Sequence, residues 1–282
     1  MIVRPALPED RPYLASFLYY EQVVHRHLDW RSLLDWIGYS PFGVLEEKGR
    51  IRAALACPID PPEIAWIRIF AVGAQISPRT AWQKLWRFAL EQFSAYFGPI
   101  IVGAIVLNRW FEHLLVESGF EQRNEIVVLI WRVTEPKPDR KMPSLKVRQM
   151  TRKDLPQVEQ VDHLAFSPPW RISSKGLLAG YEQAAIATVA EHPEGFVIGY
   201  QMSTVMNDSA HLARLAVLPA YQNCGVGTAL VHALQTYCFR IGLRSLTVNT
   251  QGDNLVSLHL YSKLDFHPTG EKYPLFLFER RN

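Results

Sequence analysis

The strongest constraint on the fold is that the chain repeats itself at a nearly constant spacing. Short motifs of the first half recur in the second half after 144, 145 and 146 residues. Each copy of the first motif predicts a short strand, a turn and a helix capped by an aspartate. The matching segments are Val3–Pro12 with Val147–Pro156, Phe70–Val72 with Leu215–Val217, and Asn108–Phe120 with Asn254–Phe266. A constant offset across three separated segments predicts two copies of one fold.

A segment rich in proline and charge separates the two copies. Residues 135–143 read Glu-Pro-Lys-Pro-Asp-Arg-Lys-Met-Pro. Proline lacks a backbone N–H and disfavours helix, so this segment predicts a linker. The predicted domains are therefore residues 1–134 and 144–282, and a chain of 282 residues is long enough for each to bury a core.

Composition excludes several classes of protein. Hydrophobic residues make up 48% of the chain and charged residues 20%, which is typical of a globular protein. A net charge of +3 without a cluster of like charges argues against a dedicated nucleic-acid binder. No apolar stretch approaches the roughly 18 residues of a membrane span. The N-terminal residues lack the apolar core of a signal peptide, and the cysteines (Cys57, Cys224 and Cys238) lack disulfide or metal spacing, so we expect a cytoplasmic protein without a bound metal.

Strands and helices alternate along the second half. Strands are predicted over residues 195–204, 211–217, 245–250 and 275–279, and helices over 227–241 and 255–264. This order predicts an α/β (α+β) fold in which helices flank a central sheet, and the repeat predicts the same arrangement in the first half.

The most informative segment is a glycine-containing loop between a strand and a helix. The strand that ends at Val217 is stopped by Pro219, and the loop opens directly into the helix. Gly225 and Gly227 permit positive φ angles and a close approach of the backbone to a ligand. The unpaired N–H groups and the dipole at the start of the helix favour an anion. The loop therefore predicts a phosphate or pyrophosphate site.

Two ordered motifs in the second half resemble the GNAT acetyltransferase superfamily. The first, Val217-x-Pro-x-x-Gln222-x-x-Gly225-x-Gly227, resembles the acetyl-CoA signature of that superfamily. The second, Asn254-x-x-Ser-x-x-Leu-Tyr-x-x-Leu-Asp-Phe266, follows at the expected distance. The resemblance covers the second half fully and the first half as a degenerate copy. It implies two tandem GNAT-like domains, each with a mixed, mostly antiparallel sheet flanked by helices.

The resemblance also implies a cofactor and a reaction. Acetyl-CoA, or another acyl-CoA, would be the co-substrate, and the acetyl group would pass to a primary amine of a small molecule, peptide or protein by direct attack in a ternary complex. The strand edge would pair with the pantetheine amides, the loop would wrap the pyrophosphate, and Asn254 would bind the pantetheine arm. The implied cofactor-binding residues are Leu215, Ala216, Val217, Gln222, Asn223, Cys224, Gly225, Val226, Gly227, Thr228, Asn254 and Ser257.

Acyl transfer to an amine requires a neutral amine, a stabilised oxyanion and a proton for the leaving thiolate. Tyr261 aligns with the general acid of the family, although packing of its ring in the core is the alternative. The backbone N–H of Val217 is the candidate oxyanion donor. His211 is the candidate base and resembles the histidine on the corresponding strand of arylalkylamine N-acetyltransferases. Strand alternation predicts that His211 shares a face with Val217, and a histidine bonded only to a structural neighbour is the alternative.

The acceptor is less constrained by the sequence. The segment Phe166–Trp170 resembles a Pro-Trp segment of N-terminal acetyltransferases and predicts an apolar wall, although packing onto the core would also explain it. Glu159, Asp162 and Glu182 are acids that could attract an ammonium group. The sequence does not distinguish among four kinds of acceptor: a small amine, a polyamine, an aminoglycoside or a protein amino group. Asn249 replaces the glutamate of some ribosomal-protein acetyltransferases, which weakens assignment to that subgroup. We expect no specific nucleic acid or membrane partner, and a homodimer is possible.

The first half lacks the residues that this chemistry requires. Thr80 and Trp82 stand at the positions of Gly225 and Gly227, and Leu115 stands at the position of Tyr261. The indole of Trp82 is expected to occlude the space of the pyrophosphate. The first domain is therefore predicted to be vestigial, with a structural role. The competing function for the whole chain is a regulatory module that binds acyl-CoA without turnover, and the presence of Tyr261 favours an enzyme.

Overall fold

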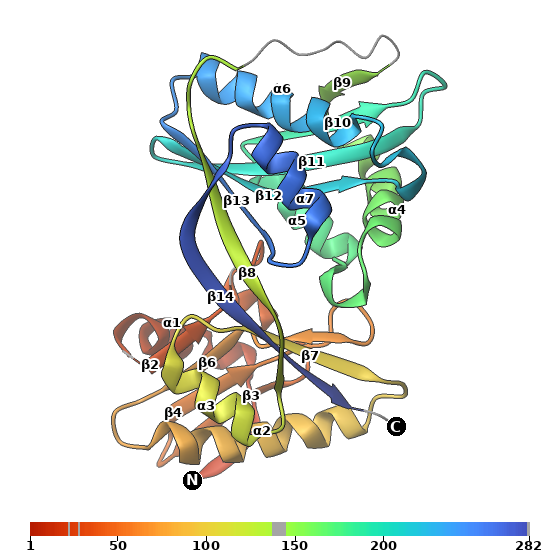
Figure 1. Ribbon diagram of the computed structural model, residues 1–282. Helices are drawn as coiled ribbons and strands as arrows, with labels where there is room; N and C mark the ends of the chain where they lie inside the picture. Colours follow the sequence, from red (N-terminus) through yellow and green to blue (C-terminus); the bar gives the residue numbers. More distant parts are fainter. Residues whose placement is uncertain (22, 28, 137–144, 281–282) are drawn as a thin grey trace. The chain divides into compact units, whose positions relative to one another are not determined.

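The computed structural model describes residues 1–21, 23–27, 29–136 and 145–280 and divides the chain into two compact units (Figure 1). The first unit contains Met1–Arg123 together with the segment that begins at Tyr273, and the second contains Asn124–Lys272. Most of the predicted linker over 135–143 lies outside the described residues. Among those that are described, no helix is long and apolar enough to cross a membrane.

The last strand of each repeat crosses into the other unit, which differs from the predicted domains 1–134 and 144–282. Residues 126–132 of β8 (Glu121–Arg132) pair antiparallel with β13 (Ser245–Gln251) of the second unit. Residues 275–280 of β14 (His267–Arg280) pair antiparallel with β7 (Ile100–Ile105) of the first unit. Hydrophobic periodicity predicts that a segment is a strand but carries no information about which sheet the strand joins. The sequence therefore predicts that each strand belongs to the domain formed by its own repeat.

Antiparallel strands dominate the first unit. A five-stranded sheet has the order β1-β3-β4-β6-β2, and β5 lies beside β7. The strands are connected by the helices α1 (Arg11–Tyr20), α2 (Pro78–Ser94) and α3 (Arg109–Glu117). The bounds of the remaining strands are Ile2–Pro5 for β1, Val23–Arg26 for β2, Phe42–Glu47 for β3, Arg50–Ala56 for β4, Ile64–Trp66 for β5 and Ile69–Val72 for β6.

The second unit contains a mixed sheet in the order β8-β13-β12-β11-β10-β9. Helices α6 (Val226–Arg240) and α7 (Leu255–Lys263) pack on one face of this sheet, whereas α4 (Leu155–Ala165) and α5 (Ser174–Gln183) contact the strands from the other (Figure 1). The remaining strands are β9 (Lys146–Gln149), β10 (Ile186–Glu191), β11 (Val197–Met206) and β12 (Ser209–Val217). The predicted class, helices flanking a mixed and mostly antiparallel sheet in each of two copies, is confirmed.

Identical ion-pair clusters mark the start of both copies. The guanidinium group of Arg4 binds Asp10 at 2.7 Å and Glu46 at 2.7 Å. Its counterpart Arg148 binds Asp154 at 2.8 Å and Glu191 at 2.5 Å. The hydrogen bonds from Arg148 hold the pKa of Asp154 down at about 2. The repeat read from the sequence is therefore a repeat of specific contacts.

Helix α6 shows how the local sequence fixes the elements around the loop. Gly225 is its N-cap in a left-handed conformation, with a φ of 84°. Leu230, Leu234 and Cys238 recur every four residues and are buried, so one face of the helix packs on the sheet. Just after the C-terminal end of α6, Gly242 has a φ of 73°, and the N–H of Leu243 donates a hydrogen bond to the carbonyl of Cys238. This arrangement is common where helices end. The predicted helix over 227–241 differs by one residue at each end.

Candidate active site

An open edge lies in the middle of the second unit's sheet. β12 and β13 run parallel and pair only between Ser209–Leu212 and Ser245–Val248. Beyond these residues the two strands have no further paired positions in the portion of the chain that the structure describes. On its other side β12 stays paired with β11 up to Val217. The side of residues 213–217 that faces away from β11 is therefore an edge to which an extended ligand can hydrogen-bond.

The register of β12 fixes which backbone groups reach this edge. In an antiparallel pair, alternate residues direct their N–H and C=O groups to the partner strand. The N–H of Leu218 donates to Ile198 of β11, so Ala216 also faces β11, whereas Leu215 and Val217 face the open edge. The side-chain amide of Gln222 donates to the Val217 carbonyl at 3.1 Å, consistent with this direction. Leu215 and Val217 can thus bind a ligand through the backbone, and Ala216 cannot.

Unpaired backbone donors gather at the loop after β12. Asn223 has a φ of 60° and Gly225 a φ of 84°. Left-handed conformations at these two positions turn the chain sharply into α6, and asparagine tolerates this conformation better than most residues. Within the described residues, the backbone N–H groups of residues 223–228 have no hydrogen-bond acceptor. Unpaired donors at a helix N-terminus suit a phosphate or pyrophosphate. The side chain of Cys224 is exposed in this loop.

Gly227 is required for space rather than for a positive φ angle. It lies in the first turn of α6 with a helical conformation, so the positive φ that glycine permits is used at Gly225 and not at Gly227. A Cβ atom at this position would lie 3.2 Å from Leu260 Cδ2 of α7 and 3.9 Å from Val217 Cγ2. Gly227 therefore allows α6 to begin close to both α7 and the end of β12.

Asn254 caps helix α7. Its side-chain oxygen accepts a hydrogen bond from the N–H of Ser257 at 3.1 Å, and its amide nitrogen donates to Gln251 at 3.2 Å. An asparagine at an N-cap stabilises a helix in this way. One amide hydrogen of Asn254 is already bound to Gln251. The predicted hydrogen bond to a pantetheine arm would therefore use the second amide hydrogen.

Tyr261 lies on α7 and belongs to the hydrophobic core between the helices and the sheet. Its side chain is only 4% exposed and packs against Phe266 with ring centroids 5.5 Å apart. Burial raises the pKa of Tyr261 well above its usual value, so the hydroxyl stays protonated at neutral pH. Among the described residues this hydroxyl has no hydrogen-bond partner, and the fully enclosed unpaired polar atoms belong instead to Arg31, Arg52 and Arg68. The proton of Tyr261 is thus available to a ligand.

His211 lies on the opposite face of the sheet from Leu215 and Val217, contrary to the prediction from alternation. Met202 pairs with Arg214 and Ser203 with Leu212, so Ala213 is an extra residue in a β-bulge. A bulge reverses the alternation of side chains along a strand. Leu215 and Val217 consequently pack toward α6, whereas Arg214 contacts α4. His211 pairs with Thr247 of β13, whose neighbours Leu246 and Val248 face the helices α6 and α7. His211 thus lies on the α4 side, immediately before the strands diverge.

Burial of the ring lowers the pKa of His211 below its usual value. The imidazole is therefore neutral at neutral pH and able to accept a proton. Its Nδ1 atom lies 2.9 Å from the hydroxyl of Thr247. Both alternatives raised by the sequence, a base and a histidine bonded to a neighbour, are compatible with this geometry.

A buried ion pair, which sequence reasoning missed, fixes the candidate acceptor segment to β12. Asp162 of α4 is 1% exposed and accepts hydrogen bonds from Arg214 Nε at 2.8 Å and from the Tyr200 hydroxyl at 2.5 Å. Arg214 also donates to the carbonyl of Trp170 at 2.6 Å, and its guanidinium lies 3.7 Å from the centre of the Phe166 ring. Asp162 is therefore a structural anchor and not an exposed attractor of ammonium groups. Asp162 and Arg214 are 52 positions apart in the sequence, so their pairing and burial could not be predicted from local patterns.

The matching edge of the first unit is occupied by the chain itself. β5 and β6 together correspond to β12 after the spacing of 145 residues. β6 pairs with β4 on one side, as β12 pairs with β11, but on the other side it pairs with β2 from Val23–Val72 to Arg26–Ile69. The backbone groups that are free in the second unit are thus already bound to a neighbouring strand in the first.

The first unit has also lost the loop with unpaired donors. Helix α2 begins at Pro78, so the residues that correspond to 223–225 are helical. The hydroxyl of the N-cap Ser77 accepts a hydrogen bond from the N–H of Thr80 at 3.1 Å. A helix capped by its own side chain offers fewer free donors to an anion.

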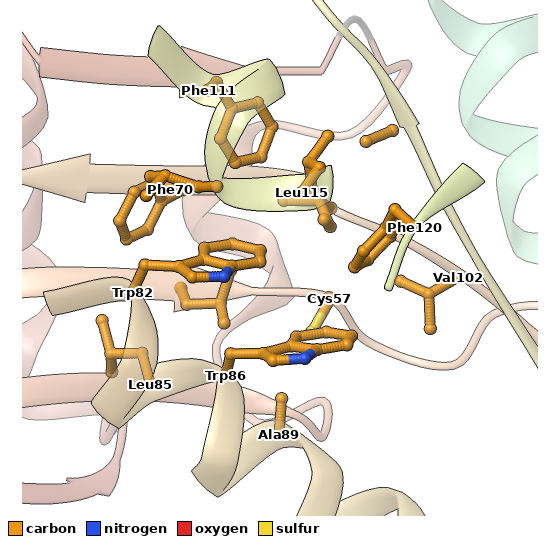
Figure 2. Close-up of a cluster of buried hydrophobic side chains, with 14 of the residues drawn as sticks. Cys57, Phe70, Trp82, Leu85, Trp86, Ala89, Val102, Phe111, Leu115 and Phe120 are labelled. Carbon is orange, nitrogen blue, oxygen red and sulfur yellow. The ribbon is translucent and has the colours of Figure 1, made fainter. Parts of the chain in front are cut away.

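Trp82 lies in the core of the first unit rather than in a loop, which corrects the expected mode of occlusion. The side chain is 1% exposed, and its indole nitrogen donates to Ser118 at 2.7 Å. Figure 2 shows Trp82 in one cluster with Phe70 of β6 and Phe111 of α3, whose ring centroids lie 5.0 and 5.5 Å from that of Trp82. Leu115, at the position of Tyr261, is fully buried in the same cluster. Aromatic side chains thus stand in the first unit at the positions that the repeat offset assigns to Gly227 and, for Phe111, to Ser257.

The second unit is similar in sequence to known acetyltransferases. Residues 155–266 match the model of the Acetyltransferase (GNAT) family. An uncharacterized N-acetyltransferase of Methanocaldococcus jannaschii is 25% identical over 121 residues, which cover 43% of this chain and 76% of the relative. The [ribosomal protein bS18]-alanine N-acetyltransferase of Escherichia coli is 26% identical over 114 residues, which cover 40% and 75%.

Two solved structures share the fold of the whole chain. A GCN5-related N-acetyltransferase from Sphaerobacter thermophilus has a TM-score of 0.65 at 16% identity and covers 100% of this chain and 96% of its own. A tandem GNAT protein from the clavulanic acid biosynthesis pathway has a TM-score of 0.67 at 15% identity, with 99% and 98% covered. At these identities the likeness concerns the fold. No cluster of side chains suited to a metal occurs in the described parts of the chain.

Proposed function

The chain is a tandem member of the GNAT acetyltransferase superfamily, and we propose that its second unit is an acetyl-CoA-dependent N-acyltransferase acting on a primary amine. The observation that carries this proposal is the combination of a strand edge at Leu215 and Val217 that pairs with no neighbouring strand and the free backbone donors of residues 223–228. The first would pair with the amides of the pantetheine arm, and the second would bind the pyrophosphate.

The residues around this edge account for the steps of acyl transfer. The neutral amine attacks the thioester carbonyl carbon, and a carbon–nitrogen bond forms while the carbonyl oxygen becomes an oxyanion. The outward N–H of Val217 would stabilise that oxyanion. The carbon–sulfur bond then breaks, and Tyr261 gives its proton to the departing thiolate. His211 takes the proton that the amine loses, directly or through a water molecule. The products are an amide and free CoA.

The acceptor segment is the part of the site that the Asp162–Arg214 pair holds in place. Phe166 and Trp170 provide aromatic surface beside β12. An apolar wall beside a neutral base suits an amine carried by a peptide or by a small apolar molecule. Because relatives act on ribosomal protein bS18 alanine, a peptide with N-terminal alanine belongs in the first panel of acceptors, together with polyamines, aminoglycosides and arylalkylamines.

Replacing Tyr261 by phenylalanine should lower kcat at least tenfold, a barrier increase of about 1.4 kcal/mol. The substitution removes the hydroxyl and keeps the buried ring against Phe266, so the fold and the affinity for acetyl-CoA should be retained. The measurement is the rate of free thiol release from acetyl-CoA with the best amine of the panel.

The matched control for Tyr261 is Tyr237→Phe, which removes a hydroxyl from a half-buried tyrosine of α6. We expect its kcat to equal that of the wild type. Equal kcat values for Tyr261→Phe and the wild type, with chemistry rate-limiting, would exclude Tyr261 as the acid. Saturable binding of acetyl-CoA without thiol release for any amine would instead support a regulatory binding module.

A further inference from the structure

His211 and Thr247 form a pair whose hydrogen bonds determine where the imidazole proton lies. The Nδ1 atom of His211 is 2.9 Å from the Thr247 hydroxyl oxygen, and that oxygen is 3.3 Å from the carbonyl oxygen of Ala210. Parallel pairing of β12 with β13 places His211 directly opposite Thr247, so the contact follows from the register of the sheet.

Counting protons leaves one assignment that satisfies both contacts. A carbonyl oxygen can only accept, so the Thr247 hydroxyl must donate its single proton to Ala210. The hydroxyl oxygen can then only accept from His211, which requires a proton on Nδ1. In a neutral imidazole the other nitrogen, Nε2, then carries the lone pair.

We propose that Thr247 is a positioning residue that holds His211 in the Nδ1–H tautomer and leaves Nε2 as the nitrogen that accepts the amine proton. This inference rests on the proposed function, because it concerns the candidate base of that reaction. Nε2 has no hydrogen-bond partner among the residues covered by the structure, and it is not one of the fully enclosed unpaired polar atoms. The Nε2 atom is therefore not fully enclosed by the protein.

The tautomer is a useful test because isolated neutral histidine prefers the proton on Nε2. Holding it on Nδ1 requires an acceptor at a fixed place, which the hydroxyl of Thr247 supplies. A valine at position 247 keeps the β-branched shape but has no acceptor, whereas a serine keeps the hydroxyl. Thr204 of β11 is the matched control, since it pairs with His211 from the other side.

The experiment is nitrogen NMR of the histidine rings in the full chain, at a pH about two units above the reference pKa of 6.5 so that the rings are neutral. His211→Gln identifies the signals of His211 among the nine histidines. We expect the Nδ1–H tautomer in the wild type, in Thr247→Ser and in Thr204→Val. In Thr247→Val the population should move toward Nε2–H. An Nε2–H tautomer in the wild type, or an unchanged tautomer in Thr247→Val, overturns the inference.

A kinetic measurement separates this inference from the proposed function. With the best acceptor, Thr247→Val should lower kcat/KM at least about tenfold, within the range that a general base contributes, while the KM for acetyl-CoA stays unchanged. Thr247→Ser should restore the rate. A full rate in Thr247→Val overturns the positioning role even if the tautomer changes. Absence of turnover in the wild type would refute the proposed function, whereas the NMR result would still decide the tautomer.

Discussion

Replacing Gly227 by tryptophan should abolish measurable binding of acetyl-CoA. A Cβ atom at this position would already lie 3.2 Å from Leu260 Cδ2, so the space between α6, α7 and β12 has no room for an indole. The side chain must displace the start of α6 or turn over the loop of residues 223–228. Loss of two charge-assisted hydrogen bonds, each worth about 1.5–3 kcal/mol, would weaken binding at least about 100-fold.

The control for this substitution is Phe239→Trp, which enlarges an exposed side chain at the other end of the same helix. We expect it to bind acetyl-CoA as tightly as the wild type. Titration calorimetry measures the affinity, and thermal unfolding establishes that each variant is folded. If folded Gly227→Trp binds acetyl-CoA with wild-type affinity, the pyrophosphate does not lie on this loop.

Replacing Arg214 by methionine should lower the free energy of unfolding by about 3–5 kcal/mol. Asp162 is 1% exposed, and the substitution would leave its carboxylate buried with the Tyr200 hydroxyl as the remaining side-chain donor. The Phe166–Trp170 segment would also lose its two contacts with Arg214. Chemical denaturation measures the change, and KM for the acceptor should rise in the folded fraction.

Two further variants make this prediction specific to burial. Arg244 forms an ion pair with Asp208 at the surface, with side chains 83% and 54% exposed. Arg244→Met should therefore change the free energy of unfolding by at most about 1 kcal/mol. Asp162→Asn combined with Arg214→Met removes both charges and should cost less than Arg214→Met alone, because no unpaired charge stays buried. Equal costs for Arg214→Met and Arg244→Met would contradict the assigned role.

Local sequence patterns predicted the elements of the site well. Turn and helix signals located α6 and α7 to within one residue, because glycine, proline and apolar periodicity act over short distances. The repeat offset identified equivalent residues even where side chains differ. Asp265 has a left-handed φ of 63°, like its counterpart Gly119 in the first repeat, whose φ is 83°.

Features that depend on contacts between distant segments could not be predicted from the sequence. The exchange of β8 and β14 and the pairing of β2 with β6 are choices between sheet edges, which side-chain alternation does not distinguish. The bulge at Ala213 placed His211 on the face opposite to the one predicted. The repeat offset predicts that Trp82 lies where the pyrophosphate would bind. Helix α2 begins at Pro78, about one turn earlier than α6 begins in its repeat, and Trp82 is buried in the core.

The pairing of β2 explains why we propose that the first unit does not bind acyl-CoA. In the second unit the edge at residues 213–217 is free, whereas in the first the corresponding edge is hydrogen-bonded to Val23–Arg26. The self-capped start of α2 and the aromatic cluster around Trp82 remove the loop and the space between the helices as well. Each of these differences alone would weaken binding, and together they leave one candidate site in the chain.

The most direct test of this account is the stoichiometry of acetyl-CoA binding to the 282-residue wild-type chain, measured by titration calorimetry. The open edge and unpaired loop donors of the second unit predict one site per chain, with no heat from a second site at saturating acetyl-CoA. Two saturable sites per chain would show that the first unit also binds the cofactor and would contradict the account. A single site that keeps its affinity in folded Gly227→Trp would show that the loop of residues 223–228 is not the cofactor site and would contradict it as well.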